Sequence, residues 1–325
     1  MKVVVLVLPE VLDSSLGITL DVLSTANSLR ASTGQKPLFE VAVVGTGPLR
    51  VRTGAGFEIG PLAKMPLRQF PVLVVVPGSN QPTPQKIDAW LERREVLCAG
   101  AWLRKAAKAG AHLACSCAGT FLLGHTGLLN GHVATTSWWL ARHFKKRFAS
   151  VDLDMDRMVV ADGRIWTAGA ALAQADLMLA VVSRWGTSEL AQDCARFLLL
   201  DRRVTQSHYA IASHLARQTP TIQRADRWIH ANLSGKITLD GLARALHMTP
   251  RTLSRHFASA VDMSPIQYVQ RLRVERAVQL LEASAESIDT VADRIGYSDA
   301  SMLRKLLIRE RGVTPRMLRA RPKNS

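Results

Sequence analysis

The sequence has little or none of several features that would each assign it to a class. It has only four cysteines in 325 residues, too few for a disulfide-stapled fold and typical of a reducing compartment. No stretch approaches the ~18 uninterrupted apolar residues of a membrane span. The first apolar run, Lys2 to Leu8, is too short for a secretory signal and no cleavage site follows it. We therefore expect a soluble, cytoplasmic protein without a membrane partner.

Acidic residues are also scarce, with 26 Asp+Glu against 42 Lys+Arg and a net charge of +16. Hydrophobic residues at 47% and charged residues at 21% are ordinary globular values that exclude wholesale disorder. The length suggests two domains. Residues 220–325 carry 18 Lys+Arg and 10 Asp+Glu, so a third of the chain holds half of the excess charge. Such a balance favours a polyanionic partner, with nucleic acid as the first candidate.

An internal repeat fills this basic third of the chain. Apolar residues at helical spacing occur twice, 49 residues apart, as Leu239, Leu242, Ala243, Leu246 and as Ile288, Val291, Ala292, Ile295. At the same offset, Thr249 and Ser298 are suited to cap a following helix. The second helices then repeat an apolar pair, Leu253 with Phe257 and Met302 with Leu306. The repeat predicts two helix-turn-helix units.

The outward faces of the two second helices carry basic and small polar groups. These groups can reach base edges and phosphates from a helix lying in the major groove. One such hairpin is also compatible with a merely solvated polar face, but two in register favour duplex DNA. The predicted DNA contacts are Arg251, Thr252, Ser254 and Arg255 in the first unit, and Ser301, Arg304 and Lys305 in the second.

A longer amphipathic segment from Pro265 to about Glu282 separates the two units. As a helix it would be roughly 27 Å long. With the turns included, it can hold the two reading helices about one DNA turn (~34 Å) apart. A single chain would then read two successive segments of the major groove.

This region, about residues 220–321, resembles the DNA-binding domain of AraC/XylS-type regulators. The most specific stretch runs from Ile288-Asp-Thr-Val-Ala-Asp-Arg-Ile-Gly-Tyr-Ser-Asp-Ala-Ser to Arg311-Gly-Val-Thr-Pro-Arg. The family usually carries a phenylalanine two or three residues after the serine of its second reading helix, where Met302 and Leu303 stand here. The resemblance implies sequence-specific promoter binding, usually as an activator that works with RNA polymerase.

Residues 1–190 have the pattern of an α/β domain. Residues 3–8, 39–44 and 72–76 are short apolar runs rich in valine, typical of buried parallel strands. Amphipathic stretches at 20–30 and 86–110 separate them, and Asp162-Gly163 predicts a hairpin. Val76 leads directly into Pro77-Gly78-Ser79, a strand-end loop of the kind that binds ligands in open α/β sheets.

Cys117 ends a short apolar run, and a helical apolar pattern with Gly119 follows at once. This is the arrangement of a nucleophile elbow with cysteine in place of serine. A thiol at a helix N-terminus is favoured as thiolate. A buried structural cysteine is the other interpretation, and both stay open.

The first domain resembles the PfpI-like branch of the class I glutamine amidotransferase-like superfamily, which implies a flavodoxin-like fold with a parallel sheet and helices on both faces. The matching stretches are Cys117-Ala-Gly-Thr-Phe-Leu-Leu-Gly, Gly127-Leu-Leu-Asn-Gly131 and Ala134-Thr-Thr-Ser-Trp138. Enzymes of the superfamily pair the elbow cysteine with a histidine and often an acid. Here Ser137 and Ser15 stand at those positions. The thiol thus lacks the activation that covalent chemistry needs.

The domain order resembles that of GlxA-like regulators, whose first domain is thought to sense a small molecule. The predicted division is a sensor domain at 1–190, a connector at 191–221 with a helix at 191–200, and a DNA-binding domain at 222–325. The predicted effector site comprises Cys117, Ala118, Gly78, Ser79 and Ser137. A homodimer is implied by the resemblance. His208 and His214 are expected to face solvent.

Three other hypotheses stay open. One is a cysteine-dependent amidase or hydratase that uses Cys117 and carries a DNA-binding tail. The others are a redox switch through Cys115 and Cys117, and a first domain that serves only in dimerisation. No zinc spacing links Cys115 and Cys117 to His112 or His125, and no glycine-rich phosphate loop is present. We therefore expect neither a metal nor a cofactor.

Overall fold

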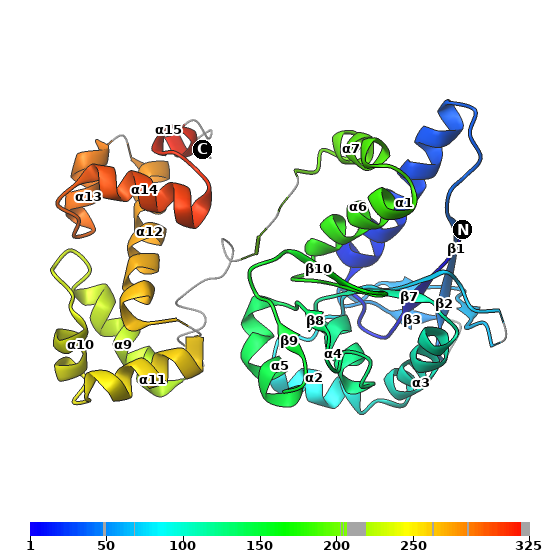
Figure 1. Cartoon of the computed structure of the whole chain (residues 1–325), viewed down its shortest axis with the longest axis horizontal. Coiled ribbons are helices and arrows are strands. Elements are labelled where there is room, and N and C mark those ends of the chain that lie inside the picture. Colours follow the sequence, from blue (N-terminus) through cyan, green and yellow to red (C-terminus); the bar gives the residue numbers. More distant parts are fainter. Residues whose placement is uncertain are drawn as a thin grey trace. The chain divides into compact units, whose positions relative to one another are not determined.

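The computed structural model describes residues 1–47, 50–67, 69–201, 203, 205, 206, 219–261, 263–284 and 286–319. The chain divides into two compact units, Met1–Ser207 and His208–Ser325 (Figure 1). Each is described by itself. Among the helices of the described residues, none combines the length and apolarity needed to cross a membrane.

The first unit is built on a mostly parallel sheet, to which the described residues contribute seven strands. In sheet order the strands are β10 (Val159–Asp162), β11 (Ile165–Ala168), β7 (His112–Ser116), β6 (Leu73–Val76), β1 (Lys2–Val7), β2 (Glu40–Gly45) and β5 (Ala63–Lys64). Among these seven strands, β10 and β11, the pair joined by the predicted hairpin, are antiparallel, and Gly163 turns between them with φ +58°. The short pairs are β3 (Val51–Arg52) with β4 (Glu58–Ile59), and β8 (Val133–Ala134) with β9 (Asp152–Leu153).

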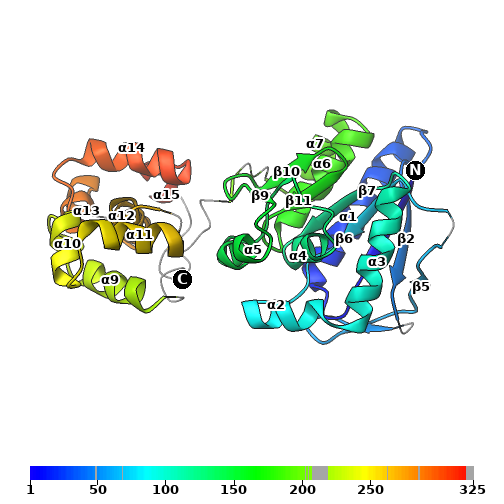
Figure 2. The same ribbon diagram turned by 60° about the horizontal axis from the view of Figure 1, so that its bottom comes forward.

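Helices cover both faces of this sheet (Figures 1 and 2). Val3, Val5 and Val7 of β1 face α1 (Asp13–Ser32), α6 (Ala173–Trp185) and α7 (Ser188–Phe197). Val4, Leu6 and Leu8 join the core on the opposite face. The helices of that face are α2 (Pro84–Leu91), α3 (Arg94–Lys108), α4 (Ala118–His125) and α5 (Ala141–Arg147), with a 3-10 turn at Trp138–Leu140. The fold is therefore flavodoxin-like, as expected.

Two helical segments differ from the sequence-based bounds. The stretch 86–110 is two helices, because α2 ends at Leu91 and α3 begins at Arg94. The segment 20–30 is the second half of a longer helix, α1. The helix expected at 191–200 is α7, which packs against α1 and α6. His208 and His214 lie outside the described residues.

The second unit contains two helix-turn-helix units joined by a long helix (Figure 1). The first consists of α9 (Pro220–Ala231), α10 (Leu239–Ala245) and α11 (Pro250–Val261). The second consists of α13 (Ile288–Arg294), α14 (Ala300–Arg311) and α15 (Pro315–Arg319). Between them runs α12 (Pro265–Ala283), close to the predicted 265–282, and Ser264 and Gln267 form a capping box at its start.

α12 divides its buried face between two separate cores. Tyr268, Val269 and Leu272 pack with the first helix-turn-helix unit. Val274 and Ala277 pack with the second. α12 thus contributes buried side chains to the cores of both helix-turn-helix units, and it fixes the distance and orientation between them.

The internal repeat changes its offset within the turn, and this corrects the predicted equivalence of the two reading helices. α10 and α13 correspond at 49 residues, but α11 and α14 correspond at 50. The cap of α14 is Asp299, whose side chain accepts a hydrogen bond from the Ser301 N–H, and not Ser298 as predicted.

The corrected offset also changes the apolar pairs of the repeat. Leu253 and Phe257 are matched by the buried Leu303 and Leu307. The predicted partners of Leu253 and Phe257, Met302 and Leu306, are therefore wrong, and Met302 is 53% exposed.

Candidate functional site

The elbow in the first unit has the predicted strand–turn–helix geometry. β7 ends at Ser116, α4 begins at Ala118, and Cys117 between them has φ +54° and ψ −124°. A positive φ is rare for a side chain with a Cβ and is typical of such elbows. A Cβ on Gly119 would lie 3.0 Å from the carbonyl oxygen of Val76, so glycine is needed where α4 passes the sheet.

The Cys117 thiol is buried, with 4% of the residue exposed. Ser137 Oγ donates a hydrogen bond to its Sγ at 3.1 Å. Burial raises the pKa of Cys117, and the hydrogen bonds from Ser137 and the Ala118 N–H only partly offset this. The neighbouring Cys115 is buried in the sheet, and burial raises its pKa to about 12. Both thiols are therefore protonated at neutral pH, and the helix N-terminus does not make Cys117 a thiolate.

Ser137 and Ser15 both lie close to the elbow. Ser137 contacts the sulfur directly. Ser15 Oγ lies 3.2 Å from the position of a Cβ on Gly78, and that position is 3.1 Å from the Cys117 Cβ. Ser15 Oγ itself donates to the carbonyl of Ala171 at 3.1 Å. A serine hydroxyl is far too weak a base to take the thiol proton, so neither residue can act as the general base that covalent chemistry at Cys117 would need.

Four of the five predicted effector-site residues come together here. Cys117, Ala118, Gly78 and Ser137 surround the start of α4, as the contacts above show. Ser79 Oγ lies within hydrogen-bond distance of the carbonyl oxygens of Pro9 (3.3 Å) and Glu10 (3.1 Å) and shares its one hydrogen between them. Ser79 thus holds the loop after β1 in place.

A buried glutamine connects the elbow to the end of the first unit. The Cys117 N–H donates to the carbonyl of Gly169 at 2.8 Å. A Cβ on Gly169 would lie only 2.5 Å from Gln206 Oε1. The amide of Gln206, a residue that is 2% exposed, donates to Thr135 Oγ1 at 2.7 Å. Sequence patterns did not indicate Gln206, since an isolated polar residue after a helix carries no periodic signal.

The predicted DNA-contact residues lie on the outward faces of α11 and α14. Arg251, Arg255, Ser301, Arg304 and Lys305 are exposed, and Thr252 and Ser254 are partly exposed. Residues on the opposite faces are buried in the two cores. Thr249 caps α11 by accepting from the Thr252 N–H at 3.2 Å and donates to Thr252 Oγ1. Ser301 Oγ donates to Asp299, so this hydroxyl is committed to the cap.

Arg273 of α12 holds the two helix-turn-helix units together. Its Nε donates to the carbonyl of Leu233 at 3.2 Å and its Nη2 to that of Gly235 at 2.6 Å, both in the loop after α9. Its guanidinium also lies over the ring of Tyr297, 5.0 Å from the ring centroid. Tyr297 lies in the turn between α13 and α14 of the second helix-turn-helix unit. A Cβ on Gly296 would lie 2.6 Å from Arg273 Nη2, so this turn approaches the arginine closely.

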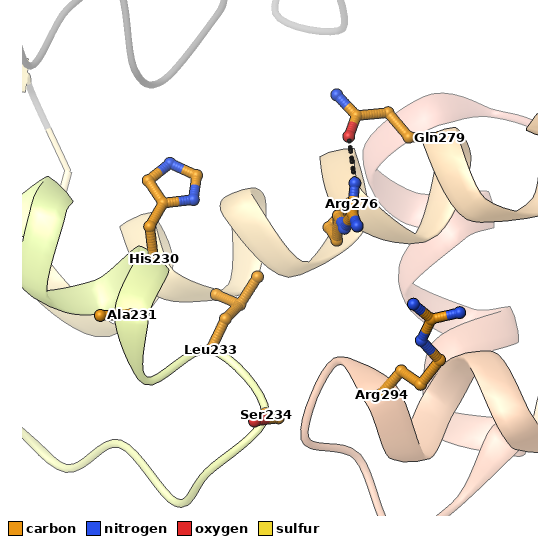
Figure 3. A pocket seen from close by; sticks show the side chains of 7 residues that line it. All are labelled: His230, Ala231, Leu233, Ser234, Arg276, Gln279 and Arg294. Atoms are coloured by element: carbon orange, nitrogen blue, oxygen red, sulfur yellow. Dashed lines mark hydrogen bonds between the residues drawn. The ribbon is translucent and has the colours of Figure 1, made fainter.

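A cavity of about 440 Å³ opens between the end of α9, α12 and α13 (Figure 3). It is lined by His230, Ala231, Leu233, Ser234, Arg276, Gln279 and Arg294. Arg276 donates to Gln279 at 3.2 Å, and Arg294 forms an ion pair with Glu286. The cations of this cavity are thus already partnered within the unit.

An elbow cysteine on a parallel sheet, followed along the chain by two helix-turn-helix units, defines an enzyme-like α/β domain fused to a DNA-reading domain. Residues 1–184 match the DJ-1/PfpI family, and residues 242–321 match a helix-turn-helix domain. The chain belongs to the DJ-1/PfpI family, and its second unit is an AraC-type helix-turn-helix domain.

Several similar proteins are described as transcriptional regulators. The HTH-type transcriptional regulator ArgR of Pseudomonas aeruginosa is 29% identical over 227 residues, 67% of this chain and 67% of ArgR. The regulator GbdR of the same species is 29% identical over 66% of this chain, an alignment that spans only 59% of GbdR. A solved protein from Vibrio parahaemolyticus, described as a transcriptional regulator, shares the fold with a TM-score of 0.52 at 19% identity, over 61% of this chain and 98% of that one.

Proposed function

We propose that this chain is a sequence-specific transcriptional regulator that binds promoter DNA as an activator and acts together with RNA polymerase. The observation that carries the proposal is the pair of reading helices, α11 and α14, each with its buried face in a core and its basic face outward. The similarity of 67% of this chain to the transcriptional regulator ArgR supports the same function.

The proposed DNA contacts are Arg251, Thr252, Ser254 and Arg255 of α11, and Ser301, Arg304 and Lys305 of α14. The arginines and the lysine supply charge to phosphates or bidentate donors to guanine. α12, with 19 residues, is about 28 Å long. This length suits two reading helices placed in successive turns of one major groove.

The first unit is proposed to bind a small-molecule effector at the elbow, next to Cys117, Ala118, Gly78, Ser79 and Ser137. All five residues are buried, so the side chains that cover them must move before a ligand can reach them. Hydroxyl groups on Ser137 and Ser15 favour recognition of a polar molecule over its turnover. The proposal therefore assigns the unit no enzymatic activity.

Gln206 suggests how occupancy of the elbow would be transmitted. Its side chain contacts Gly169 and Thr135, and the Gly169 carbonyl accepts from the Cys117 N–H. A shift of the elbow would disturb this buried amide at the end of the first unit. We further propose that the regulator works in the cytoplasm as a homodimer, in which the effector changes how the two copies present their reading helices.

The test is a genome-wide map of DNA fragments bound by the purified full chain, followed by affinity measurements on the enriched site. We expect an enriched sequence with two recognition segments one helical turn apart, and weaker binding by Arg255→Ala and Lys305→Ala. Metabolites suggested by the neighbouring genes are then titrated against DNA affinity. Absence of sequence enrichment would refute the regulator. Turnover of such a metabolite that is lost on Cys117→Ser would instead support the cysteine-enzyme hypothesis.

A further inference from the structure

Met302 lies on the outward side of α14 among the proposed DNA contacts. Its side chain is 53% exposed, whereas the adjacent Leu303 is fully buried. Residues three and four apart on a helix are neighbours. Met302 is therefore beside Lys305, and Ser301 is beside Arg304 and Lys305. An apolar side chain of this length is thus surrounded by groups suited to DNA.

With the corrected repeat, this methionine has an equivalent residue in the first helix-turn-helix unit. At the 50-residue offset of the reading helices, Arg251 matches Ser301, Ser254 matches Arg304, Arg255 matches Lys305, and Thr252 matches Met302. Thr252 and Met302 both occupy the third position of their helices. The N-terminal turn is the part of a recognition helix that reaches base edges. Three of the four α14 positions were identified from sequence, and Met302 completes the set.

The chemistry at this position is specific. Met302 has no hydrogen-bond donor, and its thioether chain is flexible enough to follow an apolar surface. In the major groove, the C5-methyl group of thymine is the apolar feature that distinguishes the bases, and apolar side chains recognise it by contact. The hydroxyl of Ser301, the other short side chain of the same turn, is already committed to Asp299.

We infer that Met302 is a specificity-determining residue that reads a thymine methyl group in the segment bound by α14. This inference rests on the proposed DNA-binding function. It predicts that the operator contains a thymine whose methyl group, and not its hydrogen-bonding edge, is required at one position facing the first turn of α14.

The experiment uses the full chain and its enriched DNA site. Each thymine of the site is replaced in turn by deoxyuridine, which removes only the methyl group. We expect the unmodified protein to lose about fourfold in affinity at one position, the effect of one apolar carbon. Met302→Ala should bind the thymine site more weakly and should not discriminate thymine from deoxyuridine at that position. Met302→Leu should retain the discrimination.

Ile308→Ala is the matched control, because Ile308 is 55% exposed on the same helix but lies beyond its first turns. It should keep the deoxyuridine effect. The inference is overturned if Met302→Ala shows the same deoxyuridine profile as the unmodified protein, or if no position is sensitive. Reduced transcription with an unchanged profile would also overturn it and would assign Met302 to a protein contact. If the unmodified protein shows no preference for any DNA sequence, the proposed function itself is refuted.

Discussion

The side-chain amide of Gln206 donates a 2.7 Å hydrogen bond to Thr135 Oγ1, across 71 residues of chain and in a buried site. Thr135 precedes Thr136, whose hydroxyl donates to the Cys117 carbonyl at 3.0 Å. Gln206, near the end of the first unit, is thereby linked to the elbow through Thr135 and the adjacent Thr136.

Gln206→Ala should loosen the elbow. Removing the amide leaves the buried Thr135 hydroxyl without its donor, which should cost about 1–3 kcal/mol in the free energy of unfolding. Hydrogen exchange of the peptide that contains Thr135 to Ser137 should accelerate. Gln223→Ala, at an exposed position of α9, is the control and should change neither quantity. Unaltered exchange in Gln206→Ala would show that the amide does not hold the elbow.

Cys117 should react slowly with iodoacetamide at neutral pH. Burial raises its thiol pKa, so the thiolate fraction is small at pH 7 and grows only as the pH rises toward the folded-state pKa. The exposed Cys98 should be modified first, as followed by mass spectrometry. In a Cys98→Ser background, Ser137→Ala should slow Cys117 further, because it removes a hydrogen bond that stabilises the thiolate. Modification of Cys117 at the rate of Cys98 would instead favour the catalytic or redox hypotheses.

Arg273→Ala should destabilise the second unit by roughly 3 kcal/mol. The substitution removes two charged hydrogen bonds to carbonyls and the contact with the Tyr297 ring. DNA affinity should fall as well, although no proposed DNA contact is changed. The two helix-turn-helix units lose the arginine that contacts both of them, so their reading helices are held less firmly in place. Arg276→Ala is the matched control, one turn further along α12 and exposed, and should stay within about 0.5 kcal/mol. Equal melting temperatures of the two variants would contradict this role.

DNA binding should weaken steeply with salt. Each phosphate neutralised contributes about −0.9 to the slope of log K against log salt, so four cations on phosphates would give about −3.6. Lys305→Gln should reduce the slope by about one such step if Lys305 contacts a phosphate. If it contacts a base, the slope should hold while preference at one position of the site relaxes. A slope unchanged by substitution of all four cations, Arg251, Arg255, Arg304 and Lys305, would place the DNA surface elsewhere.

Much of the architecture could be predicted from local patterns. The valine-rich runs indicated β1, β2 and β6, and Asp162-Gly163 indicated the hairpin, because burial and turn chemistry are visible within a few residues. The register of α14 was missed for a physical reason. Ser298 and Asp299 are adjacent and are both residue types that commonly cap helices. Met302 and Leu303 are adjacent and both apolar. A one-residue shift therefore satisfies the same pattern, and only the packed core distinguishes the two.

Other features depend on tertiary contacts that leave no local signal. The elbow was recognisable from Cys117 and Gly119, but the protonated state of the thiol follows from its depth in the fold. Gln206 and Arg273 act through partners 71 and 38–40 residues away. Their neighbours in sequence say nothing about those partners.

The sharing of α12 between two cores limits how such a domain can be divided or diversified. A fragment that ends after α11 would lack the wall that Tyr268 and Leu272 provide, and a fragment that starts at α13 would lack Val274 and Ala277. Neither half can therefore be transplanted alone as a folded DNA reader. New operator preferences are accessible instead by exchanging outward side chains on α11 and α14, one half at a time, within an undivided scaffold.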